Sequence, residues 1–83
     1  MNATAEARPG SAADQCSTDF RTWMDELFLG LATDAGVANP AELAASLHLV
    51  YDGAMISARM DHSPRAAAAA RAAAAVLVDS ALI

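Results

Sequence analysis

The residues best suited by type and spacing to carry chemistry are His48 and Asp52, which lie four positions apart in the sequence. Residues at this spacing are neighbours on one helix face, so an imidazole and a carboxylate there could hold a metal ion. Zinc sites use at least three protein ligands, and no third one lies nearby, because His62 is 14 positions further along. We therefore interpret the two residues as a solvent-facing, hydrogen-bonded pair and expect neither a metal nor a cofactor.

Other chemical signatures are also missing from the sequence. It contains no nucleophile with a base, no paired carboxylates on a shared face and no glycine-rich phosphate loop. We therefore expect no enzymatic activity. The net charge is −5 and the five arginines are scattered rather than gathered into a stripe, so we expect no direct contact with DNA.

No segment has the pattern of an export signal or a membrane span. The N-terminal residues 1–17 lack an apolar run of the length that a secretory signal needs, and we expect them to be disordered. The stretch 66–78 is nearly all apolar, but Arg71 interrupts it and it is shorter than the ~20 residues that a bilayer requires. A single cysteine, Cys16, fits a reducing compartment, so we expect a cytoplasmic protein.

The length limits how the chain can be stabilised. Its 83 residues form one domain at most, and a domain of this size buries only ~60% of the surface of its unfolded chain. The hydrophobic content of 55% includes 23 alanines, so the core is poor in volume. Without a disulfide or a metal, oligomerisation is the remaining way to reinforce so small a fold.

An apolar stripe predicts the first helix, from about Asp19 to Ala35. Ser17 or Thr18 would cap its start, and Gly36 follows its end. Six residues at helical spacing form the stripe, and we expect them to be core: Phe20, Trp23, Met24, Leu27, Phe28 and Leu31.

The second helix has the clearest start signal. Asn39 is placed as its N-cap, Pro40 takes the first helical position and Glu42 lies three residues past the cap. The helix can continue to about Asp61. Its apolar residues form two flanks, Leu43, Leu47, Val50, Tyr51, Ala54 and Ala58 on one, and Leu49, Gly53, Ile56 and Met60 on the other. A helix with two apolar flanks needs two partners.

A second cap-and-proline signal, Ser63-Pro64, predicts the third helix. It should begin at Pro64 after a turn of one or two residues, continue to Leu82 and run antiparallel to the second helix. Its alanines present a thin surface that another helix can approach closely. The expected fold class is all-α, a three-helix antiparallel unit.

The second helix has more apolar surface than its own chain can cover, which predicts a homodimer. The predicted interface residues are Leu49, Gly53, Ile56, Met60, Ala67, Ala70, Ala74 and Leu77. The other flank, Leu43, Leu47, Val50 and Ala54, would pack on Phe20, Trp23, Leu27 and Leu31, although the two assignments could be exchanged.

Three residues of the first helix, Trp23, Met24 and Phe28, could alternatively bind a small molecule at a dimer cleft. A stripe of such residues at helical spacing is more often core.

A series of motifs resembles the C-terminal end of tetracycline-repressor-like (TetR family) bacterial transcription regulators. The resemblance covers roughly residues 20–82. It consists of Ala35-Gly36, Asn39-Pro40, Leu43-Ala44, Leu47, Leu49, Asp52-Gly53-Ala54, a turn containing Asp61 and an alanine-rich final helix.

The resemblance implies that the last two helices pair with those of a symmetry mate as a four-helix bundle, and that the helix before them contributes to an inducer cavity. In that family an N-terminal helix-turn-helix domain binds operator DNA, and this sequence lacks such a domain. We therefore expect residues 18–83 to be a dimerisation and effector-domain fragment of such a regulator, whose intact form would bind a small-molecule effector. The alternative is a stand-alone helical protein–protein interaction module.

Overall fold

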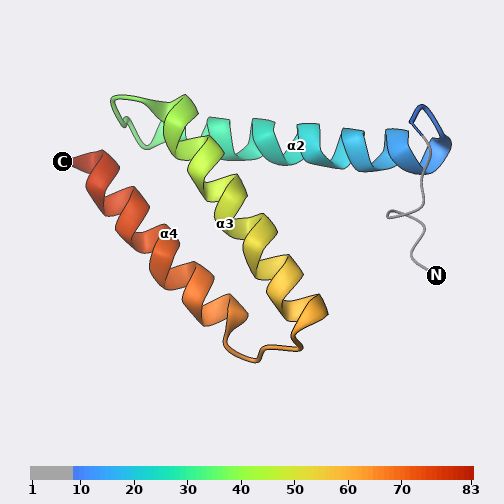
Figure 1. Ribbon diagram of the computed structural model, residues 1–83. Coiled ribbons are helices and arrows are strands. Elements are labelled where there is room, and N and C mark those ends of the chain that lie inside the picture. Colours follow the sequence, from blue (N-terminus) through green and yellow to red (C-terminus); the bar gives the residue numbers. More distant parts are fainter. Residues whose placement is uncertain (1–8) are drawn as a thin grey trace.

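The computed structural model describes residues 9–83, and they form three α-helices. Helix α2 spans Ala12–Asp34, α3 spans Pro40–Met60 and α4 spans Ala66–Leu82, which confirms the all-α class. Helices α3 and α4 lie side by side and antiparallel, whereas α2 crosses the start of α3 and extends beyond it (Figure 1). Within the described residues α2 packs on α3 but not on α4, so α3 is the central helix.

Helix α2 begins earlier than the sequence predicts. Ser11 is its N-cap, and the side-chain oxygen of Ser11 accepts a hydrogen bond of 3.1 Å from the backbone N–H of Asp14. The Asp14 carboxylate in turn accepts one of 2.9 Å from the N–H of Gly10. These reciprocal bonds satisfy N–H groups that have no partner inside the helix, so this start is favoured over one at Asp19. The predicted caps Ser17 and Thr18 are therefore wrong.

The same finding corrects the predicted N-terminal segment. Residues 12–17 belong to α2, so the expectation that they are disordered is wrong, and a boundary between residues 17 and 18 would cut the helix. Residues 1–8 lie outside the described part of the chain, and the expectation for them stays a prediction.

Helix α2 ends as the sequence predicts, with Gly36 just beyond it. Ala35 is the C-cap, and Gly36 has a φ of +78°, in the left-handed region that glycine adopts without a steric penalty. The N–H of Gly36 donates to the carbonyl of Thr33 at 3.1 Å. This turn redirects the chain so that Val37 is buried.

Replacing Gly36 with alanine should destabilise the fold by about 1 kcal/mol, because an L side chain is strained in the left-handed region. The matched control is Gly30→Ala, inside α2, where an added Cβ meets nothing within 4 Å. That control should instead stabilise the fold by up to about 1 kcal/mol through helix propensity. Urea unfolding of the two variants measures both effects, and a shift of the same sign in both would contradict the assignment of the turn.

The structure confirms the predicted start of helix α3, with Asn39 as its N-cap. The side-chain oxygen of Asn39 accepts a bond of 3.3 Å from the N–H of Glu42, and Pro40 follows the cap. The Glu42 carboxylate accepts from the side-chain amide of Asn39 at 3.0 Å, so the glutamate pairs with the side chain of the cap rather than with its backbone. The helix ends at Met60, one residue before the predicted end.

The turn between α3 and α4 is longer than predicted, and the predicted start of α4 at Pro64 is wrong. His62 has a φ of 50°, and the Ser63 hydroxyl accepts from the N–H of Arg65, two positions on, at 3.2 Å. A serine that bonds two residues ahead forms a turn rather than an N-cap, so the helix starts only at Ala66.

The core of the described chain is small and lies where the three helices meet their connections. Ala32, Val37 and Leu43 are buried at its centre, and four partly buried residues pack around them: Leu47, Leu77, Val78 and Ala81. The Cα atoms extend 44 × 29 × 13 Å, so the helices are stacked at most two deep in the shortest direction, where α2 crosses α3.

The aromatic stripe of α2 does not form the predicted core. Met24 is buried and Phe28 is partly buried, but the other four residues are 40–56% exposed: Phe20, Trp23, Leu27 and Leu31. The predicted packing of these four on Leu43, Leu47, Val50 and Ala54 is therefore wrong. The reason is that α4 covers the flank containing Leu43 and Leu47, through Leu77, Val78 and Ala81.

Candidate functional site

Helix α3 carries three stripes, roughly 120° apart at 3.6 residues per turn. One stripe, with Leu43 and Leu47, packs on α4. A second, with Ala44 and His48, is buried against α2. The third stripe holds Leu49, Gly53, Ile56 and Met60, and all four are exposed. We call these four residues the outer row.

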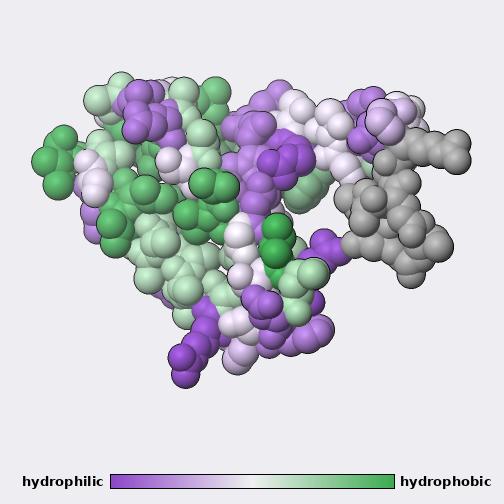
Figure 2. Space-filling view, viewed as in Figure 1, coloured by the Kyte–Doolittle hydropathy of each residue, from purple (hydrophilic) through white to green (hydrophobic). Residues whose placement is uncertain are grey.

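The outer row is apolar surface without a partner in the described chain. Leu49 is 72% exposed, Ile56 61% and Met60 75%. On the face shown in Figure 2, hydrophobic residues gather over α3 and α4, whereas hydrophilic residues lie along α2. The row contains the four α3 residues of the predicted dimer interface, but a single chain does not test the pairing, which stays a prediction.

The four α4 residues of the predicted interface have different surroundings. Ala67 is exposed, whereas Ala70, Ala74 and Leu77 are partly buried. Leu77 packs against the core cluster of its own chain. A partner helix would therefore meet α4 mainly through Ala67 and through the exposed edges of the other three residues.

The three candidate ligand-binding residues do not surround a common cavity. Trp23 is exposed and Met24 is buried. The ring of Phe28 lies 6.0 Å from the ring of His48 and 6.4 Å from that of Tyr51, centroid to centroid. The two best-formed cavities of residues 9–83, one between α3 and α4 and one along α4, are lined by none of the three.

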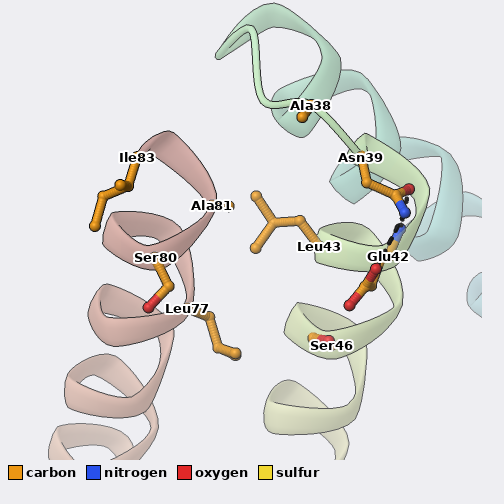
Figure 3. A pocket seen from close by; sticks show the side chains of 9 residues that line it. All are labelled: Ala38, Asn39, Glu42, Leu43, Ser46, Leu77, Ser80, Ala81 and Ile83. Atoms are coloured by element: carbon orange, nitrogen blue, oxygen red, sulfur yellow. Dashed lines mark hydrogen bonds between the residues drawn. The ribbon is translucent and has the colours of Figure 1, made fainter.

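One groove of about 370 Å³ lies elsewhere, between the start of α3 and the end of α4. In Figure 3 the side chains of Leu43 and Leu77 point from the two helices toward the space between them. These two residues and Ala81 make its apolar floor, and its polar lining comes from Asn39, Glu42, Ser46 and Ser80. The groove suits an apolar group with a hydrogen-bonding edge.

A cluster of charged side chains joins α2 to α3, and the sequence interpretation missed it. His48 is only 6% exposed, so the prediction of a solvent-facing pair with Asp52 is wrong. Its Nδ1 contacts the carboxylate of Asp25 on α2, and its Nε2 lies 3.5 Å from Oδ1 of Asp52. The Arg21 guanidinium, also on α2, donates to both oxygens of Asp52 at 3.2 and 2.9 Å.

The charges in this cluster support one another. The hydrogen bond from Arg21 is the main cause that lowers the pKa of Asp52, and the positive charges of Arg21 and His48 lower it further, while burial acts in the opposite direction. The same hydrogen bond and the Asp52 charge raise the pKa of Arg21.

The cluster positions α2 on α3 and has no arrangement that suggests catalysis. In residues 9–83, no three side chains of His, Cys, Asp or Glu are placed to hold a metal ion. Every buried side-chain nitrogen or oxygen described in the structure has a hydrogen-bond partner. The cluster is therefore a satisfied polar contact between two helices, which fixes their crossing more specifically than apolar packing does.

The Asp52 carboxylate should make stability depend on pH. Its folded pKa is lowered, so the stabilisation is present above the pKa of an ordinary aspartate, about 4, and is lost as the pH falls through the folded value. When the pH is lowered below about 4, the urea midpoint of the wild type should decrease by more than that of an Asp52→Asn variant. Equal pH dependence of the two proteins would contradict the role of Asp52, and Asp79→Asn, on exposed α4 surface, is the matched control.

No helix among the described residues is both long and apolar enough to cross a membrane. Comparisons with protein-family models, with curated proteins and with solved structures gave no match.

Proposed function

We propose that this chain is a homodimerising helical module, the dimerisation and effector-domain part of a tetracycline-repressor-like regulator. The observation that carries the proposal is the outer row, Leu49, Gly53, Ile56 and Met60. It is exposed on a helix whose other two stripes already have partners. An apolar row of this kind on so small a fold marks an association surface.

The composition of the outer row suits a helix–helix contact. Fully burying a side chain such as Leu49, Ile56 or Met60 contributes about 1.5–3 kcal/mol to the free energy of association. In a dimer with two-fold symmetry each of these residues is buried in both copies, so its contribution is made twice. Gly53 lies in the middle of the row, and a Cβ added there would meet nothing within 4 Å in the single chain. A bare backbone at that position lets a partner helix approach closely, as in packing between small residues.

The regulatory role rests on the resemblance and on the arrangement that accompanies it. The resemblance implies two final helices that pair and a further helix before them, and the chain has the antiparallel pair α3 and α4 with α2 before it (Figure 1). In this proposal, an effector changes helix positions in the dimer and thereby the spacing of DNA-binding domains joined to it. The chain itself contacts no DNA, catalyses no reaction and acts in the cytoplasm.

A fusion experiment tests the proposal directly. The 83-residue chain is joined to a DNA-binding domain that binds its operator only as a dimer. We expect the fusion to repress a reporter gene and the same fusion carrying Ile56→Asp to lose repression. A wild-type fusion that behaves like the DNA-binding domain alone would reject the proposal.

The alternative function, a stand-alone interaction module, is favoured by one separate observation. Five large apolar residues of α2 are exposed although the outer row lies on another helix, and four of them share one side of α2: Phe20, Trp23, Leu27 and Leu31. Dimerisation through α3 does not account for them.

A further inference from the structure

Four of the five exposed large apolar residues of α2 lie on one side of the helix, and we call them the α2 row: Phe20, Trp23, Leu27 and Leu31. Their exposed fractions are 49, 55, 40 and 56%. Steps of three, four and four residues keep them on one side of the helix. The side that meets α3 carries Met24, Phe28 and Ala32 instead, and the described part of α4 does not reach α2.

The α2 row is long enough to contact one partner helix over several turns. From Phe20 to Leu31 it spans about 16 Å at 1.5 Å per residue, or roughly three helical turns. At one end the rings of Phe20 and Trp23 lie 6.1 Å apart, centroid to centroid, and form an aromatic pair. Anchors at such spacing are typical of an amphipathic helix that binds a second helix through its apolar face.

The edge of the α2 row is acidic. Asp19 lies four residues before Trp23 and Glu26 three residues after it, so both are its neighbours on the helix surface, and both are exposed. The one cation within Ala12–Asp34 is Arg21, and both of its bonds go to Asp52 on α3. The row therefore combines an apolar centre with a negative edge that no cation of α2 neutralises.

This charge pattern decides among the possible occupants. A second copy of α2 would bring the same acidic edge against Asp19 and Glu26, and like charges disfavour that contact. An anionic membrane surface would be repelled for the same reason. A helix whose apolar stripe is flanked by lysine or arginine satisfies both the apolar centre and the negative edge.

We propose that the α2 row is a docking site for a basic amphipathic helix of a partner protein. This inference does not rest on the proposed dimer, because the outer row belongs to α3 and the α2 row to a different helix. A protein that dimerises through α3 would carry one such site in each copy.

The chain contains a built-in reporter for the test, because Trp23 is its single tryptophan. The probe is a synthetic amphipathic peptide of about 18 residues with leucine on one face and lysine on the other, without aromatic residues. Adding it to the full chain should shift the Trp23 emission to shorter wavelength with half-saturation at micromolar peptide. A peptide with glutamate in place of lysine, and one with the same composition but leucines scattered around the helix, should bind at least about tenfold more weakly.

Two sets of variants identify the surface. Leu27→Asp should weaken binding of the lysine peptide at least about tenfold, whereas Ile56→Asp on α3 should leave it unchanged. Glu26→Lys, an exposed change that leaves the apolar core intact, should weaken the lysine peptide and strengthen the glutamate peptide. This exchange of preference cannot result from loss of folding, which circular dichroism monitors in parallel.

Three results would overturn the inference. The first is no emission shift with the lysine peptide, and the second is an equal shift with the scattered peptide, which would show a contact set by charge alone. The third is a shift that follows protein concentration without any peptide, which would identify a second copy of the chain as the occupant.

Discussion

Replacing Ile56 with aspartate is expected to turn the proposed dimer into a folded monomer. Ile56 is 61% exposed in the single chain and lies inside the outer row, so the change places a carboxylate where the partner would cover it. Burying a charge without a partner costs about 3 kcal/mol or more, and each 1.4 kcal/mol is a factor of ten. The dissociation constant of the dimer should therefore rise at least about 100-fold, as measured by size-exclusion chromatography with light scattering.

A matched control separates this effect from a general response to added charge. Leu29 on α2 is 43% exposed and belongs neither to the outer row nor to the α2 row, so Leu29→Asp should leave the dimer intact. If Ile56→Asp and Leu29→Asp weakened association equally, the outer row would not be the interface.

The largest effect on folding is expected from Leu43→Ala. Leu43 is 6% exposed and lies at the centre of the only buried apolar cluster in the described chain, between α3 and α4. Truncating a buried leucine to alanine costs about 2–5 kcal/mol, and the small size of the cluster around Leu43 favours the lower half of that range. Because small domains are stable by only about 5–15 kcal/mol, urea unfolding should show a large loss.

Val76→Ala is the control for that prediction, because Val76 is an exposed apolar residue of α4 at 65%. It should change the free energy of unfolding by no more than about 0.5 kcal/mol. Both variants need the same protein concentration, since association stabilises the folded state. A similar loss in the two variants would show that the cluster around Leu43 is not the core.

The helix ends that the sequence predicts correctly are those fixed by local chemistry. Asn39, Pro40 and Glu42 define the start of α3 through bonds within four residues, and Gly36 marks the end of α2 by its left-handed backbone. The start of α2 was missed because Ser11 and Asp14 form an equally local cap in a segment whose composition suggested disorder. The start of α4 was missed because a serine before proline can form a turn as readily as a cap.

Tertiary packing explains the errors at the site. Sequence periodicity identifies the stripes of α3, but not which neighbour covers each of them, because that depends on where the turns place α2 and α4. The polar cluster was missed for a related reason. Arg21 and Asp25 lie four residues apart on the side of α2 that also carries Met24. Their partners on α3, Asp52 and His48, are likewise four residues apart. This matching spacing of charged residues was the available signal for the contact. The apolar stripe next to them dominated the pattern.

Sedimentation equilibrium of the unmodified chain shows whether a second copy covers the outer row of α3. The chain mass is 8.5 kDa, and we expect twice that value at micromolar concentration, with reversible dissociation on dilution. A helical, cooperatively folded species that keeps the mass of one chain throughout that range would contradict it.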